Sequence, residues 1–399
     1  MNIEFSPPDI SEEDIQAVSR VLRSGWITTG PETHAFEDSL AAFVGNERVL
    51  CLNSNTSGLF LALKMLGIGP GDQVITTPYT YTASASIITH IGAEIVFLDL
   101  AENSYEMDYD RLEEAITPRT KAIIAVDLGG RMCDYASIYK QVENKRGCFV
   151  PSNPLQEKLG RVAVIADGAH SLGAFSGGKR SGQAADITCF SFHAVKNITT
   201  AEGGAITWTS ALGVESSAFY RQLSIYSLHG QTKDAYEKAK MASWEYDILF
   251  PAYKLNMTDI SAALGLSQLK RYPDLLDKRR RLVCQYETEL AGQPIELYRH
   301  FGEDFSSSCH LMITSLAGMD AGRRNAVIGA LAEVGISSNV HYKPLPMHSG
   351  YKALGFDIQK YPQAYSAYEK ELTLPLYSRL TEDQVTYITD HLKRILKNI

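Results

Sequence analysis

The chain lacks the features of a membrane protein and of a nucleic-acid-binding protein. No apolar run in its 399 residues approaches the length of a membrane span, and the opening stretch MNIEFSPPDISEEDI has no basic region followed by an apolar one. Lysine and arginine number 38 against 46 acidic residues, which gives a formal net charge of −8 and leaves no basic cluster suited to a phosphate backbone. We therefore expect a cytoplasmic protein that binds neither membranes nor nucleic acids.

Cysteine is sparse and shows no ligand pattern. The six cysteines include no CxxC pair, and several stand inside apolar runs. We expect reduced packing residues and no metal site. Internal repeats and low-complexity tracts are also absent from the sequence.

What the sequence does contain is an alternation of apolar strand-like segments with helical stretches, which predicts an α/β fold with a mainly parallel sheet. Beyond about Thr258 the pattern changes to two long amphipathic helices, a strand-like segment and further helices. We predict a large α/β domain over residues 1–257 and a smaller α+β domain over residues 258–399, with the active site between them. The expected strands of the sheet are residues 49–52, 74–77, 94–100, 121–126, 162–166, 187–192 and 205–208.

One lysine carries the functional argument. Lys196 stands in SFHAVKNITTAEGG, just after an apolar strand-like run and before a glycine pair. By residue type alone, such a lysine is most often a solvated surface charge. If it is buried, desolvation favours the neutral, nucleophilic amine. A Schiff base with pyridoxal phosphate is one stable way to keep that amine uncharged.

A pyridoxal phosphate site also needs an anion for the pyridine nitrogen, a phosphate cradle and an aromatic face. Asp167 ends the apolar run VAVIA, where an α/β sheet opens toward its ligand, although a turn or a helix N-cap is the alternative for this residue. The stretch NSNTSG before a helical run offers Thr56 and Ser57 as phosphate ligands. Ser191 adds a hydroxyl, Tyr81 is the candidate for ring stacking, and His170 for the cofactor's phenolic oxygen.

Together these motifs resemble the DegT-type nucleotide-sugar aminotransferases, a fold type I pyridoxal phosphate family, over nearly the whole chain. The matching segments are SGWITTGP, NSNTSG, GDQVITTPYTYTAS, AITPRTKAII, ADGAHSLGA, SFHAVKNITTAEGG and YKLNMTDISAALG. The likeness is greatest to enzymes that aminate C4 of UDP-linked 4-keto sugars. It implies an amino acid donor, glutamate by analogy, and a nucleotide-sugar acceptor.

The resemblance also implies roles for individual residues. Lys196 would bind the cofactor aldehyde and shuttle the proton, Asp167 would pair with the pyridine nitrogen, and Asn256 would complete the phosphate site of a neighbouring subunit. A homodimer with shared active sites follows. Candidates for contacts with the sugar nucleotide are Trp26, Thr28, Thr29, His229, Tyr253 and His341.

Two departures from the family pattern stand out. The chain reads ADGAHS where the family usually has EDAAHA or EDAAQA, and residues 146–161 form an insertion that we expect to be a surface loop. Two alternatives to an aminotransferase stay open. One is a sugar dehydratase relative, although those relatives replace the lysine with histidine. The other is a non-catalytic regulatory protein that binds the same cofactor.

Overall fold

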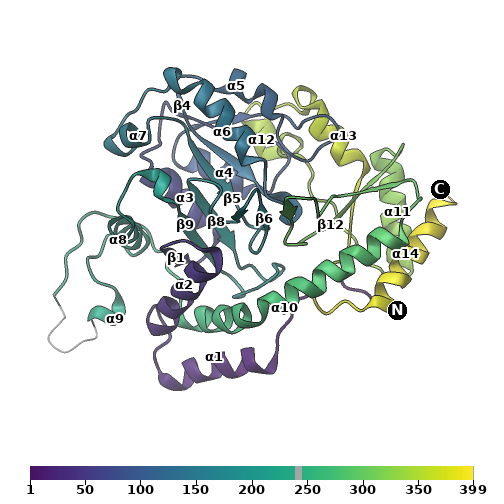
Figure 1. The fold of residues 1–399 in the computed structure, drawn as a ribbon, viewed down its shortest axis with the longest axis horizontal. Helices are drawn as coiled ribbons and strands as arrows, with labels where there is room; N and C mark the ends of the chain where they lie inside the picture. Colours follow the sequence, from purple (N-terminus) through teal and green to yellow (C-terminus); the bar gives the residue numbers. More distant parts are fainter. Residues whose placement is uncertain (239–244, 399) are drawn as a thin grey trace.

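The computed structural model describes residues 1–238 and 245–398. Its centre is a seven-stranded sheet with the strand order β1-β9-β8-β5-β4-β2-β3 (Figure 1). Strand β9 runs antiparallel to both of its neighbours, and the other neighbouring strands are parallel, so the predicted mainly parallel sheet is confirmed. The strands are β1 (Val49–Leu52), β2 (Gln73–Thr76), β3 (Glu94–Phe97), β4 (Thr120–Val126), β5 (Ala163–Asp167), β8 (Ile187–Ser191) and β9 (Gly204–Trp208).

Helices cover both faces of this sheet because its strands are apolar on both faces. In β4, Ile124 packs in one hydrophobic cluster and Ile123 packs in the opposite one, as the two-residue period of a strand requires. Both side chains are fully buried. The first cluster includes side chains of α3 (Asn55–Met65), α4 (Ala83–His90) and α8 (Ser216–Ser227), and the second includes those of α5 (Leu112–Ala115) and α6 (Tyr135–Asn144).

The insertion at residues 146–161 is more ordered than the loop that we expected. It contains the short helix α7 (Pro154–Leu159), which Asn153 caps by accepting from the backbone N–H groups of Leu155 and Gln156. The amide side chains of Asn153 and Gln156 both donate to the carbonyl of Leu66, next to the end of α3. The expectation of a loop was wrong because Asn followed by Pro is also a helix-start signal.

The C-terminal part has its own small sheet and its own hydrophobic cluster. Strands β10 (Ile295–Leu297), β12 (Met312–Leu316) and β13 (Glu371–Leu374) pair antiparallel, and α11 (Ala321–Glu333) and α14 (Glu382–Leu396) pack on them. The other elements are α1 (Glu12–Ser24), α2 (Pro31–Val44), β6 (Phe175–Ser176), β7 (Lys179–Arg180), α9 (Ala235–Lys238), β11 (Phe305–Ser306), α12 (Ser349–Ala353) and α13 (Pro362–Lys370).

A single helix, α10 (Asp259–Glu289), stands where we expected two. Its first half packs against α1 and α2, and its second half lies in the C-terminal cluster and against α14 (Figure 1). The N-terminal residue Ile3 also belongs to the C-terminal cluster. A domain boundary after residue 257 therefore stays a prediction, because α10 packs with both parts of the chain.

In the part of the chain that the structure describes, no helix is long and apolar enough to cross a membrane, and no group of side chains is arranged to hold a metal ion. All six cysteines are described, and all are free thiols.

The basic run KRRRL (residues 278–282) in α10 is partly buried. Arg279 is buried, and its Nη1 donates to the carbonyls of Cys309 (3.2 Å) and Leu376 (3.0 Å). Burial lowers the pKa of Arg279 to about 10. Its neighbour Arg280 forms an ion pair with Asp277 at the surface. Arg279 thus fastens α10 to the C-terminal part.

We expect Arg279→Met to destabilise the protein by about 2 to 3 kcal/mol, because two buried carbonyls would lose their donor. The matched change Arg280→Met should cost no more than about 0.5 kcal/mol, because it breaks only an exposed pair. Urea unfolding of both variants measures the difference. Equal effects of the two substitutions would refute the anchoring role of Arg279.

Candidate active site

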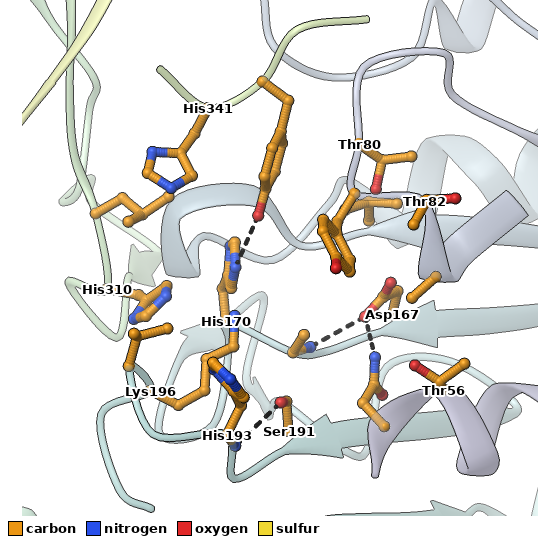
Figure 2. A pocket seen from close by; sticks show the side chains of 18 of the residues that line it. Thr56, Thr80, Thr82, Asp167, His170, Ser191, His193, Lys196, His310 and His341 are labelled. Carbon is orange, nitrogen blue, oxygen red and sulfur yellow. Dashed lines mark hydrogen bonds between the residues drawn. The ribbon is translucent and has the colours of Figure 1, made fainter. Parts of the chain in front are cut away.

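The strand ends of the large sheet and the C-terminal part enclose one cavity of about 970 Å³ (Figure 2). Asp127, Asp167 and Ser191 line it where β4, β5 and β8 end, and residues 339–343 line it from the C-terminal part. This is the edge at which open α/β sheets bind ligands. The sequence prediction of a site between the two parts of the chain agrees with this position.

Lys196 lines this cavity, on the loop after β8. Burial lowers the pKa of its amine to about 8, and the negative charge of Asp167 opposes part of that shift. The next residue, Asn197, anchors the loop to the C-terminal part: its side chain donates to the carbonyl of Ser308 (2.8 Å) and accepts from Nδ1 of His310 (2.9 Å). The alternative of a solvated surface lysine is therefore wrong.

Asp167 is a buried carboxylate at the end of β5, and its position is fixed by three donors. Its Oδ1 accepts from the side-chain amide of Asn55 (2.9 Å) and from the backbone N–H of Ala169 (3.2 Å). Its Oδ2 accepts from the hydroxyl of Ser84 (2.6 Å). The carboxylate points into the cavity in Figure 2. It faces the ligand space and caps no helix, and its bond from the N–H of Ala169, two residues further on, also gives it the turn role considered for this residue.

His170 is buried beside Asp167 and is held in one tautomer. Nδ1 accepts from the backbone N–H of Gly129 (3.2 Å), so the proton of the neutral ring sits on Nε2, which lies 3.4 Å from the hydroxyl of Tyr342. Burial holds the pKa of His170 well below its usual range, and the nearby charge of Lys196 adds to the effect. His170 is therefore a neutral hydrogen-bond donor.

The predicted phosphate residues do not all reach the cavity. Thr56 and Ser191 line it, whereas the hydroxyl of Ser57 turns away and donates to Oδ1 of Asn53 (2.6 Å). The start of α3 lies so close to β9 that a Cβ on Gly204 would stand 2.3 Å from the backbone nitrogen of Asn55. Only glycine permits this approach, which keeps the first turn of α3 at the cavity wall.

Tyr81 lies at the mouth of the cavity with 62% of its surface exposed. Its ring centroid is 6.4 Å from that of Tyr342. An aromatic ring with a free face at the entrance is suited to stacking on a planar ligand.

The other predicted substrate residues divide into two groups. His341 lines the cavity. Trp26, Thr28, Thr29, His229 and Tyr253 do not, and neither does Asn256. Several residues of this second group are bonded to one another. The side chain of Asn256 donates to the hydroxyl of Thr29 (2.6 Å), and the indole of Trp26 donates to the carbonyl of Thr29 (3.2 Å). The backbone N–H of His229 donates to the carbonyl of Tyr253 (2.7 Å).

Several residues of the site were not predicted from the sequence. Asn55 stands inside NSNTSG, where it was passed over for its hydroxyl neighbours, and Tyr342 directly follows the predicted His341. No sequence signal linked Ser84 or His310 to Asp167 and Lys196. The remaining polar cavity residues that we did not predict are Ser6, Ser54, Thr80, Thr82, Asp127, His193, Glu202, Asn339, Lys343, His348 and Tyr351.

Comparison with known proteins gives consistent matches over the full length. The family model DegT/DnrJ/EryC1/StrS aminotransferase family matches residues 8–393. The spore coat polysaccharide biosynthesis protein SpsC of Bacillus subtilis is 37% identical over 399 residues, which is 99% of this chain and 97% of SpsC.

Solved structures agree with this result. The pyridoxal phosphate form of the putative sugar aminotransferase Spr1654 from Streptococcus pneumoniae is 48% identical with a TM-score of 0.96, and the match covers 100% of this chain and 99% of that one. PseC of Helicobacter pylori, an aminotransferase involved in pseudoaminic acid biosynthesis, is 28% identical with a TM-score of 0.85 over 100% of both chains.

We expect Asp167→Asn to lower the pKa of Lys196 further below its value of about 8, because a carboxylate stabilises the neighbouring ammonium group. The measurement is the pH dependence of acylation of Lys196 in cofactor-free protein, followed by mass spectrometry. The surface variant Asp134→Asn is the control and should leave the profile unchanged. A profile of Lys196 that stays in place or moves to higher pH in Asp167→Asn would contradict the assignment.

Proposed function

Because the chain belongs to the DegT/DnrJ/EryC1/StrS aminotransferase family, we propose that it moves an amino group from glutamate to C4 of a nucleotide-linked 4-keto sugar. The family and its solved members make the chain a pyridoxal phosphate-dependent sugar aminotransferase. The nucleotide, the carbon position and the donor are the proposed parts. A role in polysaccharide or other glycan biosynthesis fits the relatives SpsC and PseC.

The observation that carries the proposal is a lysine of lowered pKa in the same cavity as a carboxylate fixed by three donors. These residues fit pyridoxal phosphate, because the cofactor needs an amine for its aldehyde and an anion for its ring nitrogen. The wall formed by the first turn of α3 and Gly204 offers a helix N-terminus to its phosphate.

We assign Lys196 to the aldehyde, Asp167 to the pyridine nitrogen and the Nε2 proton of His170 to the phenolic oxygen. Thr56 and Ser191 would hold the phosphate, and Tyr81 would cover the ring. The hydroxyl of Ser57 is bonded to Asn53, so Ser57 would contribute to the phosphate site only through its backbone. When bound, the cofactor supplies a carrier for the amino group and an electron sink for the substrate carbon.

Lys196 performs the proton transfer. With a pKa of about 8, roughly a tenth of the free amine is neutral at pH 7, a far larger share than for an ordinary lysine. Its Nζ can therefore take a proton from the substrate carbon and return it as a general acid. Asn197 and His310 hold the lysine loop, and Asn55 and Ser84 keep Asp167 from moving.

We further propose a homodimer in which Asn256 serves the partner's cavity. Asn256, Thr29 and Trp26 are bonded together but do not line the cavity of their own chain. Ile27, Ile248 and Leu249, on the same segments, are about half exposed, as expected for side chains that a second copy covers. The same arrangement would bring the remaining predicted sugar contacts to that cavity.

The first test is covalent trapping. After incubation with pyridoxal phosphate and reduction with borohydride, we expect the cofactor mass on the peptide that contains Lys196, and on no peptide of Lys196→Ala. If the wild type forms no adduct, both hypotheses are wrong: that the protein is an aminotransferase and that it is a regulatory protein that binds the cofactor. Glutamate added before reduction should abolish the adduct. If the adduct still forms in the presence of glutamate and other amino acids, the result would favour a non-catalytic regulatory protein.

A panel of UDP, dTDP and GDP keto sugars, offered to the glutamate-treated enzyme, then tests the acceptor. We expect an amino sugar from a UDP-linked 4-keto sugar. Amination at another carbon, or of a sugar linked to another nucleotide, would correct the proposed acceptor and leave the cofactor assignment intact.

The shared site can be tested with mixed dimers. Lys196→Ala and Asn256→Ala should each lose most activity as homodimers. Co-expression should restore activity to the mixed dimer, because one of its two cavities then has both native residues, whereas mixing Lys196→Ala with Thr56→Ala should restore much less if both residues act in the same chain's cavity. Failure of the first pair to complement would refute a contribution of Asn256 across the interface.

A further inference from the structure

A chain of hydrogen bonds leads from a buried carboxyl group to the cavity. Glu371, the first residue of β13, is fully buried. Its Oε1 meets the hydroxyl of Thr373 at 2.5 Å, and that hydroxyl lies 2.9 Å from Nδ1 of His341. Its Oε2 accepts from the backbone N–H of His341 at 2.8 Å. Glu371 and Thr373 share one face of the strand because they are two residues apart.

The other end of the His341 ring is open to the cavity. Nε2 has no hydrogen-bond partner among the described residues, and His341 lines the same cavity as Lys196 (Figure 2). Phe5 stacks on the ring at 5.5 Å and fixes its plane. Burial lowers the pKa of His341 to about 3, and the charge of Lys196 contributes, so the ring stays neutral. A neutral imidazole carries one proton, which is either on Nδ1 or on Nε2.

Through Thr373, the position of that proton depends on whether Glu371 is protonated. If the carboxylate is ionised, Thr373 donates to it and accepts from Nδ1–H, which leaves a lone pair on Nε2. If Glu371 is protonated, it donates to Thr373, Thr373 donates to Nδ1, and the ring proton sits on Nε2. We propose that Glu371, acting through Thr373, sets which nitrogen of His341 carries the proton and so whether His341 offers the sugar a donor or an acceptor.

The sugar part of this inference rests on the proposed function. The carbonyl oxygen of a keto sugar can only accept a hydrogen bond, so it pairs with the Nε2–H form. Glu371 and Thr373 are then positioning residues, and His341 is the group that contacts the substrate. This specifies the role of His341, which the sequence analysis placed only among residues near the sugar.

The surroundings of Glu371 determine when the switch occurs. Burial raises its pKa to about 8, while the bonds from Thr373 and His341 and the charge of Arg324 oppose that shift. Below about pH 8 the carboxyl group of Glu371 holds its proton and the proton of His341 is on Nε2. Above about pH 8 Glu371 is ionised and the proton of His341 is on Nδ1. The titratable groups that face Glu371 are Arg324 of α11, Tyr79, Tyr105 and Tyr342, and those that face His341 are Lys196, His170 and His310.

Nitrogen NMR of histidine-labelled holoenzyme tests the switch directly. We expect the His341 signals, assigned by their loss in His341→Gln, to report Nε2–H at pH 6 and Nδ1–H at pH 10. Glu371→Gln should show Nε2–H at both values, because its amide oxygen can accept from the His341 backbone while its NH₂ donates to Thr373. Thr373→Ser should switch as the wild type does, and Thr373→Val should not. A wild-type tautomer that stays unchanged between pH 6 and pH 10 overturns the proposal, as does a switch in Glu371→Gln.

Steady-state kinetics tests the contact with the sugar. In the wild type we expect the KM for the keto sugar to rise about five- to tenfold above pH 8, the effect of one hydrogen bond, and to stay flat in Glu371→Gln. The reaction with glutamate alone should have the same pH profile in both, because it depends on Lys196 and not on His341. Parallel KM profiles would refute the sugar contact. If no keto sugar reacts at all, the proposed function fails, and the NMR result still decides the tautomer switch.

Discussion

The desolvation of one amine is the constraint on which the rest of the site depends. Lys196 is half-buried in the cavity wall, and its desolvation is the main reason for its lowered pKa. The counter-charge on Asp167 limits the shift, so the amine is neither fully charged nor permanently neutral at physiological pH. The balance requires that Asp167 remain where it is, and Asn55 and Ser84 supply the bonds that hold it.

A second pattern is the neutrality of the histidines around that amine. His170, His310 and His341 are buried, and the charge of Lys196 contributes to lowering the pKa of each of them. Neutral rings add no positive charge that would depress the pKa of the lysine still further. Each ring has Nδ1 bonded to the protein framework, to Gly129, Asn197 or Thr373. Nε2 of His170 also meets the hydroxyl of Tyr342, whereas Nε2 of His341 has no partner among the described residues.

Much of the architecture could be read from the sequence, because buried strands are short apolar runs and all seven expected runs are strands of the sheet. The site was most predictable where its residues end or follow such a strand, as Asp167, Ser191 and Lys196 do. Thr56 and Ser57 were predicted together, but only Thr56 lines the cavity, because the hydroxyl of Ser57 is bonded to Asn53. Glu371 lies 30 residues beyond His341 in the chain, and the antiparallel bridge between Asn339 and Thr373 brings the two together.

Helix α10 has a geometric consequence for the two parts of the chain. At 31 residues it is a rod of roughly 45 Å. Its start adjoins the segment that carries Asn256, and Arg279 in its second half is bonded to the C-terminal part. The helix bends most easily at Pro273, because proline has no N–H to donate to the helix. Because the helix packs with both parts of the chain, the orientation of one part constrains the orientation of the other.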